Sequence, residues 1–317
     1  MKLLVTGGAG YIGSHVVAEA LSAGHRVVVV DDLSTGVPKR LDGSVELADL
    51  NLASPGAQAK LAELMRRTGT EAVIHLAAKK QVGESVEKSE EYYRDNIGGL
   101  ANLLLAMRET KVDAMVFSSS AATYGMPDVD SVRESDVPSP INPYGQTKLI
   151  GEWMIENAKF WGLRGISLRY FNVAGSGAAG LSDTAALNLI PIAIGQLRRG
   201  ETPKVFGDDY PTSDGSCIRD YVHVSDLARA HVAALDYLER PDREHAVFNV
   251  GTGTGASVFE VLSTLREVSG IDFEPEVAPR RAGDPPKLVA NVERIEQALG
   301  FRAEKSLTEI IDSAWNL

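Results

Sequence analysis

The sequence has few of the features that mark disulfide-bonded, metal-binding or membrane-spanning proteins. Cys217 is the only cysteine among 317 residues, which excludes an intramolecular disulfide and a cysteine-bound metal cluster. A single thiol suits a reducing compartment, and its ordinary role is that of a small buried apolar side chain. No apolar stretch approaches the roughly 18 residues that cross a bilayer, and the amino terminus shows no signal peptide. We therefore expect a cytoplasmic protein.

Positive charge is also scarce. The chain has 32 lysines and arginines against 43 aspartates and glutamates, a formal net charge of −11. Such a surface repels nucleic acids and anionic membranes, so we expect neither as a partner. An anionic ligand would have to meet a few well-placed cations. The hydrophobic fraction of 44% and the charged fraction of 24% are ordinary for a globular protein and argue against disorder.

Strand and helix patterns alternate through the first half of the chain. Apolar, β-branched runs indicate strands at Leu3–Thr6, Arg26–Asp31, Ala72–Leu76, Ala114–Ser118 and Ile166–Tyr170. Helical patterns cover Ile12–Ala23, Ala57–Thr68, Ser89–Thr110 and Tyr144–Phe160, and Gly69, directly after the second of them, is a helix stop signal. This alternation predicts an α/β fold of the Rossmann type, with a doubly wound parallel sheet whose ligands bind beyond the carboxyl ends of the strands.

The rhythm changes after Tyr170. Residues 172–218 are rich in glycine, proline and aspartate and carry one helical stretch, at about Ala185–Arg199. Strand and helix signals return at Tyr221–Tyr237 and Val247–Gly251, and no repeat or flexible linker is visible. We expect a nucleotide-binding domain over residues 1–171, to which segments at about 219–251 return. Residues 172–317 should mainly form a smaller, substrate-binding lobe.

A glycine-rich segment follows the first strand and opens the first helix. Gly8, Gly10 and Gly13 satisfy the pattern G-x-G-x-x-G, in which glycines let backbone amides approach a pyrophosphate at the helix N-terminus. Asp31 ends the next strand, 18 residues past Gly13 (31 − 13). A carboxylate there accepts hydrogen bonds from ribose hydroxyls and repels a 2′-phosphate, which favours NAD over NADP. Asp32 is an alternative to Asp31.

Three polar groups predict the chemistry. Asn142 and Pro143 suit the N-cap and first position of a helix, which places Tyr144 and Lys148 one turn apart on one face. A phenol titrates near pKa ~10 and burial raises that pKa, so nearby cations must lower it if Tyr144 is to act as a base. Ser120 follows a strand and can hydrogen-bond the reacting oxygen. We predict that these three residues are catalytic.

The six histidines show no metal-ligand spacing, and no metal site is expected.

Together these motifs resemble the extended short-chain dehydrogenase/reductase family, and in particular its UDP-glucose (UDP-galactose) 4-epimerases. The resemblance runs from end to end. Its motifs are TGGAGYIGSH (6–15), KKQVGES (79–85), YFNVAG (170–175), FGDDYPTSDGSCIRDYVHVSDLA (206–228) and RRAGD (280–284). The fourth motif is the longest and the most specific.

The resemblance implies roles for individual residues. NAD would be contacted by Gly7, Gly10, Tyr11, Ile12, Asp31 or Asp32, Asp49, Leu50, Lys80, Asn96, Lys148 and Tyr170. The hexose would meet Ser120 and Tyr144. The UDP moiety would be held by Asn172, Asn188, Val205, Phe206, Arg219, Arg281 and Asp284. The two arginines offer fork-shaped donors that suit a diphosphate.

The implied activity is that of an isomerase of galactose metabolism. UDP-glucose and UDP-galactose would be interconverted by NAD-dependent oxidation at C4, rotation of the 4-keto intermediate and reduction on its opposite face. The resemblance also implies a homodimer that associates through the helices at Ser89–Thr110 and Tyr144–Phe160. The sequence departs from the family at Thr123, which is offset by one residue, and at Leu288, which occupies a position near the hexose that is often aromatic or small.

The sequence is also compatible with other functions. Nucleotide-sugar 4,6-dehydratases carry an Asp-Glu pair after the serine or threonine, and Ala121-Ala122 in that place argue against dehydration. An epimerase of a UDP-N-acetylhexosamine, or an epimerase or decarboxylase of a UDP-uronate, would share the fold. A catalytically silent dinucleotide-binding protein would show a damaged Ser/Tyr/Lys set, and this set is intact.

Overall fold

The computed structural model describes residues 1–185, 187–240, 245–281 and 283–316. The chain divides into two compact units of interleaved segments. Unit 1 comprises Met1–Thr123, Pro140–Arg169 and Ala228–Phe248, and unit 2 comprises Tyr124–Ser139, Tyr170–Leu227 and Asn249–Leu317. Each unit has its own hydrophobic core.

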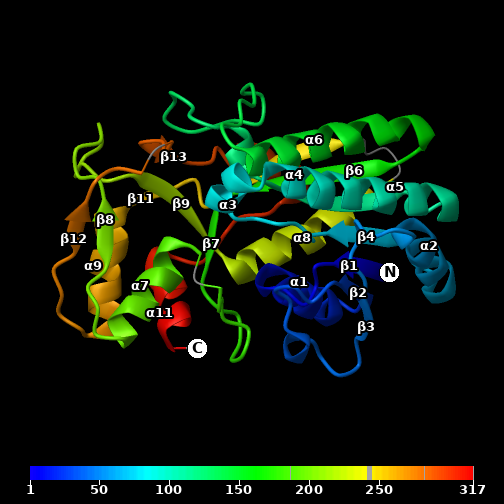
Figure 1. Cartoon of the computed structure of the whole chain (residues 1–317), viewed down its shortest axis with the longest axis horizontal. Helices are drawn as coiled ribbons and strands as arrows, with labels where there is room; N and C mark the ends of the chain where they lie inside the picture. Colours follow the sequence, from blue (N-terminus) through cyan, green and yellow to red (C-terminus); the bar gives the residue numbers. More distant parts are fainter. Residues whose placement is uncertain (186, 241–244, 282, 317) are drawn as a thin grey trace. The chain divides into compact units, whose positions relative to one another are not determined.

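The main sheet confirms the Rossmann-type fold. Its seven strands are β1 (Lys2–Thr6), β2 (Arg26–Asp31), β3 (Glu46–Asp49), β4 (Ala72–His75), β5 (Ala114–Ser120), β6 (Arg164–Tyr170) and β10 (Ala246–Val250). They lie in the order β10-β6-β5-β4-β1-β2-β3, and β1 pairs in parallel with both β2 and β4. Figure 1 labels β6, β4, β1, β2 and β3 of this sheet. The strand order therefore reverses beside β1, which is where doubly wound sheets bind their ligands.

The central strands are hydrophobic on both faces. Every residue of β4 and β5 is buried, and so is every residue of β1 after Lys2. Strands covered by helices on both sides read as continuous apolar runs rather than as alternating ones. The same reasoning explains why β3 was not predicted, because its four residues begin and end with an acid and none of them is fully buried.

Unit 1 also contains helices and short helical turns, and the longer helices pack against its sheet. They are α1 (Tyr11–Ser22), η1 (Pro38–Arg40), α2 (Ala57–Thr68), α3 (Val82–Glu87), α4 (Ser89–Tyr92), η2 (Tyr93–Gly98), α5 (Gly99–Thr110), η3 (Ala121–Thr123), α6 (Pro143–Ala158), η4 (Lys159–Trp161) and most of α8 (Val224–Leu238). As predicted, α2 ends where Gly69 takes the left-handed conformation, with φ at 65°. Figure 1 shows α5 and α6 on one side of the strands and α1 on the other.

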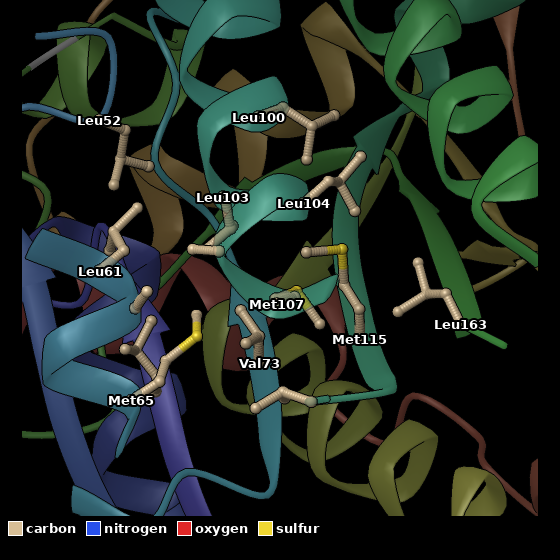
Figure 2. Packing of buried hydrophobic residues seen from close by; sticks show 14 of the residues in the cluster. Leu52, Leu61, Met65, Val73, Leu100, Leu103, Leu104, Met107, Met115 and Leu163 are labelled. Atoms are coloured by element: carbon tan, nitrogen blue, oxygen red, sulfur yellow. The ribbon is translucent and has the colours of Figure 1, made fainter. Parts of the chain in front are cut away.

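The core of unit 1 lies where α2 and α5 pack over the sheet. Leu103 and Met107 of α5 meet Met65 of α2 above Val73 and Met115 of the strands (Figure 2). All five side chains are at most 1% exposed. Full burial of a side chain of this size contributes roughly 1.5–3 kcal/mol. This packing fixes α2 and α5 against β4 and β5.

The helix predicted over Ser89–Thr110 contains a widened turn that the sequence did not reveal. Its middle, η2, is π-helical and separates α4 from α5. Two side chains of this turn bond to α6: Tyr93 to Gln146, and Asn96 to Thr147. Isolated π turns commonly occur at functional sites because they redirect side chains. Here the turn presents two polar groups to the helix that carries Tyr144 and Lys148.

Unit 2 has smaller sheets and its own helices. Its strands are β7 (Asn172–Ala174), β8 (Lys204–Phe206), β9 (Ile218–His223), β11 (Gly255–Ser257), β12 (Glu276–Ala278) and β13 (Lys287–Leu288). Its helices are α7 (Leu189–Arg198), α9 (Val258–Ser269), α10 (Glu293–Leu299) and α11 (Leu307–Asn316). Strand β9 is central, because β7, β11 and β13 all pair with it.

The helix predicted at Ala185–Arg199 begins later than expected. Asn188 is the N-cap of α7, and its backbone is extended. Ala186 lies outside the described residues. Pro191 then falls in the first turn, where the missing N–H costs the helix nothing.

Among the described residues, no helix is long and apolar enough to cross a membrane.

Candidate active site

The glycine-rich turn brings backbone against backbone at the start of α1. Gly7 has φ at 73°, and its amide donates to the carbonyl of Val30 at 2.8 Å. A Cβ on Gly10 would lie 3.2 Å from the carbonyl oxygen of Gly7, and a Cβ on Gly13 would collide with that oxygen. Gly10 is the N-cap of α1 and offers no side chain to its first amides. A turn this bare, at a helix N-terminus, fits a pyrophosphate.

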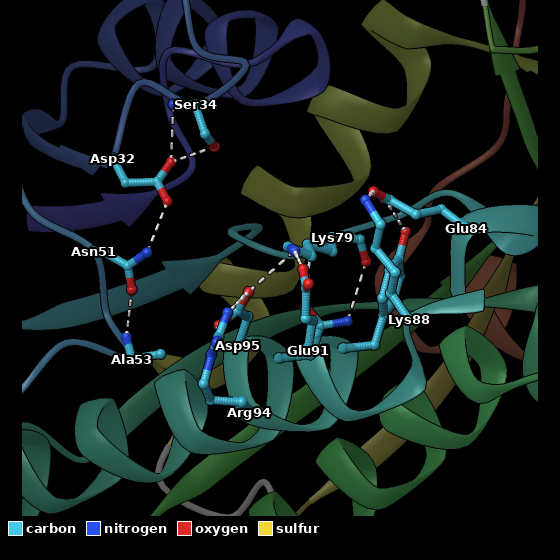
Figure 3. A network of polar contacts seen from close by, with 12 residues as sticks. Asp32, Ser34, Asn51, Ala53, Lys79, Glu84, Lys88, Glu91, Arg94 and Asp95 are labelled. Atoms are coloured by element: carbon cyan, nitrogen blue, oxygen red, sulfur yellow. Dashed lines mark hydrogen bonds and ion pairs between the residues drawn. The ribbon is translucent and has the colours of Figure 1, made fainter. Parts of the chain in front are cut away.

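Asp31 lies against this turn. Its Oδ2 accepts from the amide of Ala9 at 3.0 Å, and its Oδ1 accepts from Leu33 at 2.9 Å. Burial raises the pKa of Asp31, and both amide hydrogen bonds act in the opposite direction. The Asp32 carboxylate is instead engaged by Ser34 and by Asn51 (Figure 3). Of the two candidates, Asp31 is therefore the one fixed to the glycine-rich turn.

Most of the other residues predicted to contact NAD lie in unit 1. Asp49 pairs with Asp31 across β2 and β3, and the Leu50 amide donates to the Asp31 carbonyl at 3.0 Å. Tyr11 is buried edge-on against His15. Ile12 is half-buried, and Lys80 is exposed beyond the end of β4. Tyr170 ends β6 and is half-buried in unit 2.

Asn96 differs from a simple ligand-facing side chain. Its Oδ1 accepts from the amide of Lys79 at 2.8 Å, and its Nδ2 donates to the Lys79 carbonyl and to Thr147, each at 3.0 Å. Lys79 itself bonds Glu91 at 2.6 Å and Asp95 at 3.3 Å (Figure 3). Asn96 thus ties the loop before Lys80 to α6, a role that the sequence did not indicate.

Ser120, Tyr144 and Lys148 come together in unit 1. Ser120 ends β5, and its hydroxyl hydrogen-bonds Tyr144. As predicted, α6 starts at the Asn142 cap, which accepts from the amide of Gly145 at 2.8 Å, with Pro143 at the first position. Lys148 Nζ donates to the carbonyl of Ser118 at 2.7 Å and lies 5.9 Å from the centre of the Tyr144 ring.

Burial dominates the electrostatics of this group. The three side chains are between 4% and 8% exposed. Burial raises the pKa of Tyr144, and the hydrogen bond from Ser120 lowers it. Burial also lowers the pKa of Lys148 to about 7, while the charge of Glu152 acts in the opposite direction. Burial therefore moves the pKa values of the phenol and the amine apart, and both groups are of a kind that exchanges a proton with a substrate hydroxyl.

Glu152 and Arg169 form a buried ion pair beside this group, which sequence reasoning missed. Both are 4% exposed, and Ser119 adds a hydrogen bond to Glu152 at 2.5 Å. Two signals were present in the sequence. Glu152 follows Lys148 by one helical turn, and Arg169 is a charge inside the apolar run of β6. Buried charges of this kind are almost always paired.

The residues predicted to hold UDP fall in unit 2. Arg219, on β9, forms an ion pair with Asp284. Arg281 lies over the ring of Phe206 at 3.8 Å from its centroid, and Val205 beside it is fully buried. Asn172, on β7, hydrogen-bonds Tyr221, and Asn188 occupies the N-cap position of α7. Two arginines of this set are therefore paired, Arg219 with a carboxylate and Arg281 with an aromatic ring.

The two departures from the family have definite positions. Thr123 is fully buried, and its hydroxyl donates to the backbone carbonyl of Ser120 at 2.9 Å, so it supports the strand end. Leu288 is half-buried on β13 and pairs with Arg219 of β9. Leu288 therefore neighbours a residue predicted to hold UDP.

Known proteins match this chain over its whole length. The model of the NAD dependent epimerase/dehydratase family matches residues 3–251. The UDP-glucose 4-epimerase of Corynebacterium glutamicum is 45% identical over 320 residues, which cover 99% of this chain and 95% of that protein.

Two solved structures superpose closely. The UDP-glucose 4-epimerase of Stenotrophomonas maltophila, with bound NAD and formylated UDP-arabinopyranose, has a TM-score of 0.94 and 37% identity, covering 99% of this chain and 97% of that one. The UDP-Glc/GlcNAc 4-epimerase of Campylobacter jejuni has a TM-score of 0.87 and 38% identity, covering 99% and 98%. The chain therefore belongs to the NAD dependent epimerase/dehydratase family, within its UDP-glucose 4-epimerase branch.

Proposed function

We propose that this protein interconverts UDP-glucose and UDP-galactose by NAD-dependent oxidation and reduction at C4. The observation that carries the proposal is the buried cluster of Ser120, Tyr144 and Lys148 in the unit that also holds the glycine-rich turn. Ala121 and Ala122, directly after Ser120, offer no acid–base pair for dehydration. The UDP-glucose 4-epimerase relatives support the same activity.

The residues of unit 1 fit NAD. Backbone amides of the turn at Gly7–Gly13 would receive the pyrophosphate, and Asp31 would receive a ribose. We assign Asp49, Leu50, Lys80, Asn96, Lys148 and Tyr170 to the same cofactor. When bound there, NAD supplies a reversible hydride acceptor for C4 of the hexose.

Tyr144 holds and returns the proton of the 4-hydroxyl group. Ser120 donates to the same oxygen and stabilises it as the carbon is oxidised. Lys148 lowers the energy of the phenolate through its positive charge, which acts across a site that excludes water. The planar ketose must then turn over before the hydride returns, so the hexose has to be held loosely.

UDP provides the binding energy that a loosely held hexose does not. We assign that task to the unit 2 residues Arg219 and Arg281, with Phe206 and Asp284 beside them. Asn172, Asn188 and Val205 complete the proposed set. Binding energy placed on a remote nucleotide leaves the reacting carbon free to present either face.

The expected cytoplasmic location stays a prediction.

A second candidate activity is epimerisation of UDP-N-acetylglucosamine. It is favoured by Leu288, which stands where the family often has an aromatic or a small residue near the hexose. The similar Campylobacter jejuni protein is a UDP-Glc/GlcNAc 4-epimerase. Leucine is shorter than tyrosine but fills more space than glycine, so the N-acetyl group would enter at some cost.

We also propose that the protein is a homodimer that associates through α6. Trp153 on this helix is 54% exposed, and Phe160 in the turn that follows is 84% exposed. Large aromatic side chains exposed on a helix and on the turn that follows it are typical of an association surface. A two-fold interface with a second copy would remove both aromatic side chains from water in each copy.

The proposed function predicts turnover without added cofactor. Purified protein should convert UDP-galactose to UDP-glucose, because NAD is regenerated in each cycle and can stay bound. Denaturation should release about one NAD per chain, measured by anion-exchange chromatography. Release of NADP alone, or full activity in protein shown to lack any dinucleotide, would contradict the proposal.

Replacement of the proposed base should abolish most of the activity. Tyr144→Phe removes the proton acceptor and is expected to lower kcat by ~10²–10⁴-fold while UDP-hexose still binds. Steady-state kinetics and calorimetric titration with UDP-glucose measure the two effects. Tyr237→Phe keeps its ring contact with Phe248 and serves as the control. A Tyr144→Phe enzyme within about threefold of wild type would refute the role.

Leu288 should control the choice between the two hexose types. Overpacking typically costs ~1–3 kcal/mol, so we expect UDP-N-acetylglucosamine to be epimerised roughly five- to two-hundred-fold more slowly than UDP-glucose. Leu288→Tyr should suppress the N-acetylated substrate selectively, and Leu288→Gly should favour it. The measurement is the ratio of the two kcat/KM values. An unchanged ratio in both variants means that Leu288 does not line the hexose site.

Association through α6 should depend on its exposed aromatics. Sedimentation velocity should show a dimer for wild type and a monomer for Trp153→Glu, because a buried unpaired carboxylate opposes the interface. Val277→Glu changes a residue that is 48% exposed on β12 and should remain dimeric. A monomeric wild type, or a dimeric Trp153→Glu variant, would exclude this interface.

A further inference from the structure

A buried carboxylate connects the three elements around the proposed catalytic group. Glu152 lies on α6, and its Oε1 accepts from Ser119 Oγ at 2.5 Å and from Arg169 Nε at 2.9 Å. Its Oε2 accepts from Arg169 Nη2 at 2.6 Å. Ser119 belongs to β5 and Arg169 to β6. One side chain thus joins a helix to two neighbouring strands.

The neighbours of these residues are the ones to which the proposed function assigns catalysis. Ser119 directly precedes Ser120, and Glu152 follows Lys148 by one helical turn. A buried ion pair adds little stability compared with apolar residues of the same volume, because both charges lose their hydration. The position of Glu152 therefore calls for an explanation other than stability.

We propose that Glu152 is a positioning residue for the reaction, whose carboxylate fixes the strand end that carries Ser120 and keeps Lys148 positively charged. Arg169 and Ser119 hold that carboxylate in place. The inference rests on the proposed function in assigning a task to the charged Lys148. The contacts of Glu152 with β5 and β6 are independent of it.

The surroundings of Lys148 show why this charge matters. From α6 it faces Tyr144 and Glu152, from β5 the ring of Phe117 at 5.0 Å and the carbonyl of Ser118, and from β4 His75. Burial lowers the pKa of His75 to about 3, so this ring is neutral at physiological pH. Arg169 on β6 is already paired with Glu152.

Among the described groups around Lys148, Glu152 is the one that opposes the effect of burial. Burial lowers the pKa of Lys148 to about 7, and the negative charge of Glu152 raises it. Removal of that charge destabilises the protonated amine, so the pKa of Lys148 must fall. A step that requires the ammonium form is lost as pH rises through this pKa, and the loss therefore begins at a lower pH.

The test is the pH dependence of kcat in Glu152→Gln, an isosteric variant that can still bond Ser119. We expect its alkaline limb to move to lower pH by about one unit, as for loss of a near opposite charge. Glu156→Gln is the matched control, because Glu156 lies one turn further along α6, where its side chain is 52% exposed beside Lys159. Its profile should superimpose on that of wild type.

A direct titration separates this inference from the proposed function. The ¹³Cε resonance of Lys148, identified by its absence in Lys148→Ala, should titrate at lower pH in Glu152→Gln than in wild type, whether or not the protein turns over UDP-hexoses. If Glu152→Gln does not fold, Glu152→Gln/Arg169→Met leaves no unpaired charge. It should shift the midpoint in the same direction, because Glu152 is the one of the two whose charge raises the pKa of Lys148.

Three outcomes are decisive. An unchanged Lys148 midpoint in the folded variant overturns the inference even if wild type is an active epimerase. A shifted midpoint in a protein without epimerase activity supports the Glu152–Lys148 coupling and rejects the proposed function. A lowered kcat with an unmoved pH profile assigns Glu152 a purely structural role and also overturns the inference.

Discussion

The burial of Lys148 is the constraint on which the rest of the site depends. An ammonium group that is 4% exposed loses most of its hydration, and its pKa falls to about 7 as a result. The surrounding structure compensates with the carbonyl of Ser118 and the carboxylate of Glu152, which itself needs Arg169. The same exclusion of water raises the pKa of Tyr144, and it strengthens the effect of each nearby charge on the phenol.

A second constraint acts on the backbone around the first strand. A Cβ on residue 13 would collide with the carbonyl of Gly7. Helix α1 can therefore pack against the turn only because residue 13 is glycine. Asp31 accepts a hydrogen bond from the backbone amide of Ala9 in the turn, which fixes the turn to the end of β2. The result is a row of backbone donors beside the reversal of strand order, a geometry suited to a dinucleotide.

The sequence predicted those parts of the structure that depend on local pattern. The strands β1, β2 and β4 to β6, the end of α2 at Gly69 and the start of α6 at Asn142 follow from apolar runs, a terminating glycine and an N-cap. Contacts between distant segments were not predictable in this way. The π turn at Tyr93–Gly98 and the bonds of Asn96 depend on α6, and the Glu152–Arg169 pair depends on β6. The resemblance to a family supplied the candidate UDP residues, which no periodicity indicates.

The central claim is that one site removes a hydride from C4 and returns it to the same carbon. The most direct measurement is turnover of UDP-galactose that carries deuterium at C4, with mass spectrometry of the UDP-glucose formed. The account predicts that the product keeps its deuterium at C4 and that a parallel reaction in deuterated water places none there. Loss of the label to solvent at the rate of turnover would show that a proton is removed from C4 instead, and it would contradict the account.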